Sequence, residues 1–159
     1  MKITILSVGK IKEKYWTQAL AEYARRLGRY AKLELAEVDD EPTPDRASDK
    51  EEEQIRQREG ERLLARMPRD AYVIVLAIEG KQQDSPAMAR RIADLGLAGK
   101  SHLCFVIGGS LGLSREVMAR ADEAWSFSRL TFPHQMMRVI LLEQIYRSFR
   151  IIRGEPYHK

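Results

Sequence analysis

The sequence predicts an α/β fold in which a largely parallel sheet carries helices on both faces. Apolar runs alternate with amphipathic or charged segments along the chain, the pattern of strand–helix units. The runs at 72–80 and 102–109 are almost continuously apolar, as expected of strands covered on both faces. With 159 residues, 44% of them hydrophobic, the chain is expected to form one domain over residues 1–159.

The first strand is expected over 2–9 ("KITILSVG"). Apolar and aromatic residues then recur at helical spacing from Tyr15 to Leu27, and Gly28 is a suitable residue to follow a helix. A second strand, over 33–38, precedes a proline-bearing loop. The charged run after that loop has few apolar positions, so we expect it to form a solvated helix.

A third strand, over 72–80, is followed by Ser85 and Pro86. Serine is a good N-cap and proline suits the first helical position, so these two residues predict the start of a helix. Gly96 marks its approximate end. The strand–helix alternation therefore continues through the middle of the chain.

The last third of the chain begins with a fourth strand over 102–109. Ser114 then supplies the cap of a short helix, which ends before a fifth strand over 123–128. Pro133 opens a long helix that reaches about Ile152. The apolar arc of this helix is broader than one sheet face requires. Either the apolar surface left over packs against a second copy in a homodimer, or the helix is buried deeply within one subunit.

Charge and cysteine content narrow the class of protein. Residues 1–38 and 129–159 each have a net charge of +4, whereas 39–62 has −5. Basic ends suit a surface that faces phosphates, although many basic proteins bind no nucleic acid. The single cysteine, Cys104, lies in an apolar run, which favours a reducing, cytoplasmic setting. The first apolar run is too short for a secretory signal or a membrane span, so no membrane partner is expected.

Unusual residues gather where three of the expected strands end: "LAIEGKQ", "IGGSLGLS" and "SFSRLTFPHQ". The carboxyl ends of parallel strands meet at one edge of a sheet, where ligands of open α/β sheets bind. "IGGSLGLS" is neither a dinucleotide fingerprint nor a P-loop, so neither NAD nor a nucleoside triphosphate is favoured. Its glycines allow either close approach of a ligand or simply a tight turn.

The segments "FVIGGSLGLS", "SFSRLTFPHQMMRVILLEQIYRSFRI" and "GEPYHK" resemble the ribosomal RNA large-subunit methyltransferase H family of the SPOUT superfamily, and the resemblance spans the whole chain. It implies a homodimer that transfers a methyl group from S-adenosylmethionine to N3 of a pseudouridine in 23S rRNA of the assembled ribosome. It also implies a trefoil knot at the carboxyl end of the sheet. Without the resemblance, an unknotted sheet would be expected.

Carried over residue by residue, the resemblance places the cofactor pocket at the three strand ends already noted. Its expected residues are Leu76, Gly108, Gly109, Phe127, Ser128, Arg129, Leu130, Thr131 and Phe132. We assign no side-chain role to Arg129. Backbone groups and apolar walls of this kind can hold an adenosine and a methionine tail without a phosphate cradle.

The carboxyl-terminal tail, residues 154–159, supplies three of the four candidate catalytic residues, and the long helix before it supplies the fourth. The N3 proton must leave, and His158 is the best candidate base. Arg138 and Lys159 are candidate electrostatic or phosphate partners, and Tyr157 could stack on a base. We expect His134 to be structural or adjacent to the cofactor, because a helix start disfavours its protonation. The tail would complete the partner subunit's active site; the plain alternative is a disordered tail.

Three other functions remain open on the sequence. The chain could methylate another RNA, or it could be a ribosome-associated binding protein without activity. A flavodoxin-like redox module would also suit the coarse α/β pattern. No cluster of histidine, cysteine and carboxylate residues has metal-ligand spacing, so no metal is expected.

Overall fold

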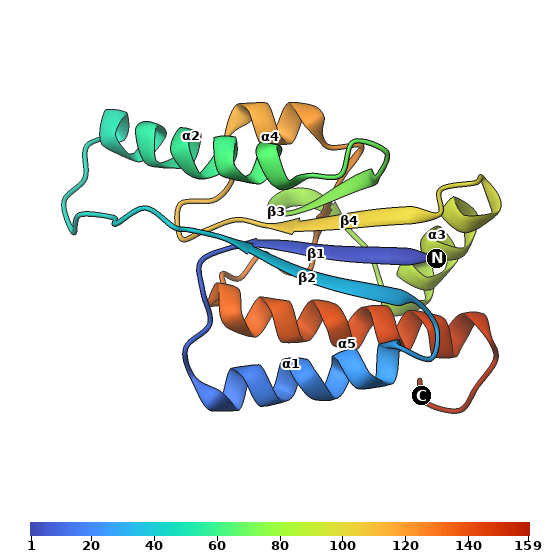
Figure 1. The fold of residues 1–159 in the computed structure, drawn as a ribbon. Coiled ribbons are helices and arrows are strands. Elements are labelled where there is room, and N and C mark those ends of the chain that lie inside the picture. The colour runs from blue at the N-terminus through green and yellow to red at the C-terminus, as the bar shows by residue number, and fades with distance from the viewer.

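The structure, a computed structural model, describes residues 1–159. In chain order its elements are β1 (Lys2–Val8), α1 (Lys14–Leu27), β2 (Lys32–Val38), α2 (Asp49–Arg66), β3 (Tyr72–Gln82), α3 (Ser85–Leu97), β4 (His102–Ile107), α4 (Arg115–Arg120), β5 (Glu123–Ser126) and α5 (His134–Ile152). The five strands form one parallel sheet in the order β2–β1–β4–β3–β5. The predicted α/β class is therefore confirmed, with helices on both faces of the sheet (Figure 1).

Two apolar clusters hold the layers together. One lies between the sheet and α1, α3 and α5, and includes Phe105 and Trp125, whose ring centroids are 5.6 Å apart. The other lies between the opposite face and α2 and α4. All six residues of β4 are buried, because this central strand is covered on both faces. That burial explains why residues 102–107 read as a continuous apolar run.

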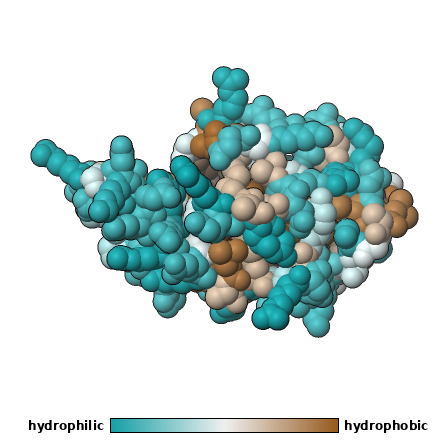
Figure 2. Space-filling model, turned by 90° about the horizontal axis from the view of Figure 1, so that it is seen from above, coloured by the Kyte–Doolittle hydropathy of each residue, from teal (hydrophilic) through white to brown (hydrophobic).

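The prediction for the charged run after β2 was only half right. It forms α2, but one side of that helix is not solvated: Ile55 and Leu63 are 6% and 1% exposed. The opposite side carries the charged residues, and the face of the molecule formed by α2 and α4 is largely hydrophilic (Figure 2). A sequence with few apolar positions can still bury a narrow stripe.

Ser48 begins α2 with a capping box. Its Oγ accepts a hydrogen bond from the Glu51 amide, while the Glu51 carboxylate accepts one from the Ser48 amide. Ser48→Ala is expected to lower the free energy of unfolding by about 1 kcal/mol. Urea denaturation would measure the loss, with Ser101→Ala, at an exposed position outside any helix, as a control. An unchanged midpoint for Ser48→Ala would contradict the role of the cap.

Helix ends differ in detail from the predictions. Asp84, not Ser85, is the N-cap of α3: its Oδ1 accepts from the Ala87 amide at 2.7 Å. Ser85 instead donates to Gln144 Oε1 at 2.7 Å, which links α3 to α5. Gly28 ends α1, but with a right-handed φ of −57°. Ser114 is the N-cap of α4, as predicted.

α5 runs from the carboxyl edge of the sheet to its amino edge between α1 and α3 (Figure 1). These two helices cover much of its broad apolar arc, as the single-subunit alternative predicted. Coverage is incomplete, because Val139 and Ile140 are only half-buried and Ile152 is 41% exposed. None of the helices combines the length and the apolar character that a membrane span requires.

Candidate functional site at the carboxyl edge of the sheet

A pocket of about 920 Å³ opens at the carboxyl edge of the sheet. The segments after β3, β4 and β5 and the first turn of α5 line it. Eight of the nine residues predicted for the cofactor line this pocket: Leu76, Gly108, Gly109, Phe127, Ser128, Leu130, Thr131 and Phe132. Arg129 does not. The fold therefore brings together residues that are up to 56 positions apart in the sequence (Leu76 to Phe132).

The segment after β4 makes a narrow turn against the pocket. The Gly112 amide donates to the Gly109 carbonyl at 3.1 Å, and Gly112 has a φ of +84°, which side chains rarely adopt. A β-carbon on Gly108 would lie 2.9 Å from Leu113 Cδ2 and 3.1 Å from the Gly112 carbonyl. The turn therefore requires glycine here, and its backbone stands free of side chains at the pocket wall.

The segment after β5 is braced by Ser128. Its Oγ accepts from the Leu130 amide at 3.0 Å, while Ser126 Oγ donates to the Ser128 carbonyl at 3.1 Å. Phe127 packs against the apolar core, whereas Leu130 is 70% exposed. This segment thus supplies one anchored wall and one free apolar side chain at the pocket rim.

Arg138 lies behind the pocket and is only 4% exposed. Its guanidinium donates to Glu37 at 2.5 Å, to the Val8 and Gly9 carbonyls at 2.9 and 2.7 Å, and to His134 Nδ1 at 3.0 Å. These contacts fasten the ends of β1 and β2 to the first turn of α5. Within the chain, Arg138 is therefore a structural tie close to the pocket.

His134 lines the pocket beside Arg138. Burial and the Arg138 charge lower the pKa of His134, so the imidazole is neutral at neutral pH. The predicted direction is confirmed, although burial and Arg138 are the causes found here. Because a guanidinium only donates, Nδ1 accepts and the ring proton sits on Nε2.

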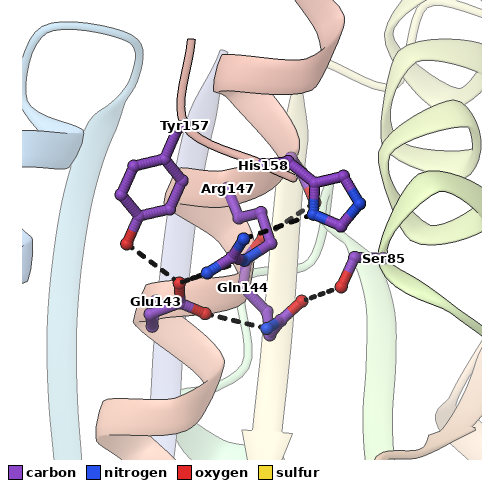
Figure 3. Close-up of polar contacts among 7 residues, drawn as sticks. Ser85, Glu143, Gln144, Arg147, Tyr157 and His158 are labelled. Carbon is purple, nitrogen blue, oxygen red and sulfur yellow. Dashed lines mark hydrogen bonds and ion pairs between the residues drawn. The ribbon is translucent and has the colours of Figure 1, made fainter.

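The tail packs along α5. Tyr157 donates to Glu143 at 3.0 Å, and the Arg147 guanidinium lies 4.6 Å from the Tyr157 ring centroid. Arg147 also donates to His158 Nδ1 at 3.2 Å (Figure 3). Burial and Glu143 raise the pKa of Tyr157 to about 12, so its phenol keeps its proton. Lys159 is exposed.

The tail of one chain does not reach that chain's pocket. Tyr157 contacts Glu143 and His158 contacts Arg147, whereas the last residue of α5 that lines the pocket is Met137. Glu143 and Arg147 lie about 9 Å and about 15 Å from Met137 along the helix axis. The structure brings the predicted cofactor residues together, but it does not bring His158 to them within one chain.

Glu59 is a residue that sequence reasoning missed. It lies on the buried stripe of α2 and is 4% exposed. Its Oε2 accepts from the Glu41 amide at 3.0 Å, but its Oε1 has no partner and lies 2.9 Å from where a Gly109 β-carbon would be. Burial, the largest cause, raises its pKa, and Asp40 adds to the rise. The sequence carried no signal of this, because Glu59 sits in a run of exposed charges.

Glu59→Gln is expected to stabilise the protein at high pH. The folded state holds the Glu59 proton more tightly than the unfolded chain, so wild-type stability falls as pH rises above the ordinary glutamate pKa. The gain should be about 1 kcal/mol at about pH 8 and smaller at about pH 5. Thermal unfolding at both pH values would measure it, with Glu61→Gln on the same helix as control. A gain in stability that is the same at both pH values would contradict a raised pKa of Glu59 in the folded state.

Comparison with known proteins identifies the family of the chain. The family model described as "Predicted SPOUT methyltransferase" matches residues 1–158. Proteins called "Ribosomal RNA large subunit methyltransferase H" are 60% identical in Bifidobacterium adolescentis and 57% in both Shouchella clausii and Clostridium novyi. Each match spans 159 residues and covers 100% of both chains.

A solved structure extends the comparison to the fold. "A probable methylase family protein" from Haemophilus influenzae superposes with a TM-score of 0.54 at 12% identity, covering 99% of this chain and 70% of that one. At that identity the likeness concerns the fold alone. Together with the match over residues 1–158, the sequence comparisons show that this chain is a methyltransferase and belongs to the SPOUT family.

Proposed function

We propose that the protein transfers a methyl group from S-adenosylmethionine to N3 of a pseudouridine in 23S rRNA of the assembled ribosome, in the cytoplasm. The observation that carries the proposal is the full-length identity, 57–60%, to proteins named as ribosomal RNA large subunit methyltransferases. SPOUT family membership supplies the reaction class, and the relatives' names supply the RNA class.

The pocket suits S-adenosylmethionine. Its volume of about 920 Å³ lies within the range of small-molecule sites. Its lining contains one cation, Arg56, and no lysine, so it offers apolar walls and backbone groups in place of a phosphate cradle. The bound donor would supply an electrophilic methyl group on a positively charged sulfur. Leu76, Phe127, Phe132 and the turn after β4 would hold its adenosine and methionine parts.

A homodimer would bring the tail to a pocket. His158 of one chain contacts Arg147, about 15 Å along α5 from Met137, the last residue of that helix in the pocket lining, and a second copy packed beside α5 could present its tail at the pocket. Val139 and Ile140, half-buried on α5, offer an apolar contact for a two-fold partner. We propose that Tyr157, His158 and Lys159 complete the site of the partner subunit.

The tail would prepare the target nitrogen for methylation. In its contact with Arg147, His158 accepts at Nδ1 and therefore carries its proton on Nε2. Acting as a base requires His158 to leave Arg147, which frees Nδ1 to take the N3 proton. Lys159 would stabilise the negative charge left on the flanking carbonyls, and Tyr157 would stack on a base. Arg138 would act as an electrostatic partner from behind the pocket, where its buried guanidinium donates to His134 Nδ1.

We also propose that the carboxyl end of the sheet is knotted. The chain leaves β5 at the edge of the sheet and returns to α5, which contacts the central strand β4. On its way, segment 127–133 shares the pocket with the segments after β3 and β4. A path of this kind is compatible with threading through a loop, and threading would fix the pocket walls to one another.

The direct test is transfer of labelled methyl from S-adenosylmethionine to ribosomes from cells that lack the modification. We expect about one methyl group per ribosome, mapped by mass spectrometry of 23S rRNA fragments. If the labelled methyl group were found on another RNA, that RNA would be the substrate and the proposal for 23S rRNA would be wrong. Cofactor binding without any transfer would favour the ribosome-associated binding protein.

The thiol of Cys104 is not expected to take part. Cys104 is fully buried in β4, and burial raises its pKa to about 12, so no thiolate is available to attack a ring. Methylation at nitrogen also needs no covalent enzyme intermediate. Cys104→Ala should keep the transfer rate within about twofold, measured with the same labelled donor. A complete loss with the fold intact would reopen covalent catalysis.

A further inference from the structure

Positive charge and exposed aromatic surface coincide in residues 10–16, between β1 and the first turn of α1. We call this segment the Lys10–Trp16 patch. Lys10, Lys12, Lys14 and Tyr15 are exposed, Tyr15 by 64%. The Tyr15 and Trp16 rings lie 5.2 Å apart at 59°. Lys10 is paired with Asp39 at 3.5 Å, whereas Lys12 and Lys14 have no ion pair.

The patch is firmly attached beside the candidate active site. Its first residues are held by a hydrogen bond from the Ile11 amide to Glu37 at 3.2 Å, and the Gly9 carbonyl accepts from Arg138 at 2.7 Å. A β-carbon on Gly9 would lie 3.1 Å from His134 Cε1, and His134 lines the pocket. The patch and the pocket therefore share the carboxyl edge of the sheet and are fixed relative to each other.

Apart from the Lys10–Asp39 ion pair, contacts within the chain do not account for this composition. The first turn of α1 contains no acidic residue and begins with Lys14, and Glu13 makes no side-chain cap. A lysine at this end of a helix is unfavourable for the helix dipole. Exposing a tyrosine ring also gains nothing for folding. The only carboxylate of the segment, Glu13, leaves it with a net charge of +2.

We propose that the Lys10–Trp16 patch is a second RNA-contact surface, which grips single-stranded rRNA next to the nucleotide being methylated. Lys12 and Lys14 would neutralise phosphates, and Tyr15 would stack on an unpaired base. Cations interleaved with aromatic rings are the chemistry that binds single-stranded nucleic acid. This inference rests on the proposed rRNA substrate and adds the surface that would orient it.

The lysines can be tested with a charge-matched pair of variants. Lys12→Ala/Lys14→Ala removes two charges from the patch, and Lys32→Ala/Lys100→Ala removes two exposed lysines from the opposite edge of the sheet. Binding to unmethylated ribosomes would be measured by co-sedimentation over a range of salt. We expect the patch variant to bind about tenfold more weakly and to show a shallower salt dependence, by about one to two units of slope. The control should bind like the wild type.

Tyr15 tests stacking separately from charge. Tyr15→Ala should weaken ribosome binding about tenfold, whereas Tyr15→Phe, which keeps the ring, should bind like the wild type. Cofactor affinity should be unchanged in both. Weakening by Tyr15→Phe equal to that by Tyr15→Ala would overturn the stacking role.

A second probe separates failure of this inference from failure of the proposed function. Binding of a short single-stranded oligouridine, followed by fluorescence anisotropy, requires no methyl transfer. If the wild type methylates no ribosome, a weaker oligouridine affinity of Lys12→Ala/Lys14→Ala would still support the patch. Equal affinities of the patch and control variants for both probes would overturn it. So would a change of oligomeric state in the patch variant, which would make the patch a contact between copies of this chain.

Discussion

Gly108→Val is expected to abolish measurable binding of S-adenosylmethionine. The new side chain would begin 2.9 Å from Leu113 Cδ2 and 3.1 Å from the backbone of Gly112, so the turn after β4 would have to move. Overpacking of this kind costs about 1–3 kcal/mol before any lost ligand contact is counted. We therefore expect the affinity to fall at least about 100-fold, measured by isothermal titration calorimetry.

Gly99→Ala is the matched control for that experiment. Gly99 has a positive φ, +84°, which Gly108 does not, but it has no neighbour within 4 Å of an added β-carbon, and it lies before β4, at the opposite edge of the sheet. Alanine there should cost about 1 kcal/mol of stability through backbone strain and leave cofactor affinity unchanged. Binding by a folded Gly108→Val variant within threefold of wild type would contradict the assigned pocket.

Removing Tyr157, His158 and Lys159 is expected to lower kcat for ribosome methylation by about 10²–10⁴-fold, the usual contribution of a general base and its neighbours. Cofactor affinity should be unchanged, because the pocket walls assigned to the cofactor come from the segments after β3, β4 and β5, which the deletion leaves intact. Single-turnover transfer of labelled methyl would measure the loss. His158→Ala should account for much of this loss in kcat. Gln18→Ala, on the surface of α1, is a suitable control, whereas Ser128→Ala is not, because Ser128 lines the pocket.

Mixing two inactive variants would show whose pocket the tail serves. If the tail completes the partner's site, a mixed dimer of Gly108→Val with the tail-deleted chain has one intact pocket facing one intact tail. Activity should then reappear after subunit exchange, at up to about a quarter of the wild-type level for random pairing. No recovery, with mixed dimers demonstrated by mass, would mean that each tail serves its own subunit.

Much of the architecture was readable because strand and helix patterns were locally consistent. Continuous apolar runs predicted β3 and β4, and Ser114 predicted the start of α4. The errors came where two local signals competed. Asp84 and Ser85 are both good N-caps, and only the path of the chain decided for Asp84. The half-buried α2 was misjudged because its buried stripe is narrow and contains Glu59 and Gly60.

By itself, the sequence determined the α/β class, the order of the elements, and the three strand ends at which a pocket would form. Those features follow from local periodicity and from the rule that parallel strands share one carboxyl edge. The tertiary structure alone decided that Arg138 is a buried tie, that one carboxylate oxygen of Glu59 has no partner behind Gly109, and that the tail folds onto α5 away from its own pocket. These facts depend on which distant segments meet, and burial and pairing at such contacts leave no periodic trace in the sequence.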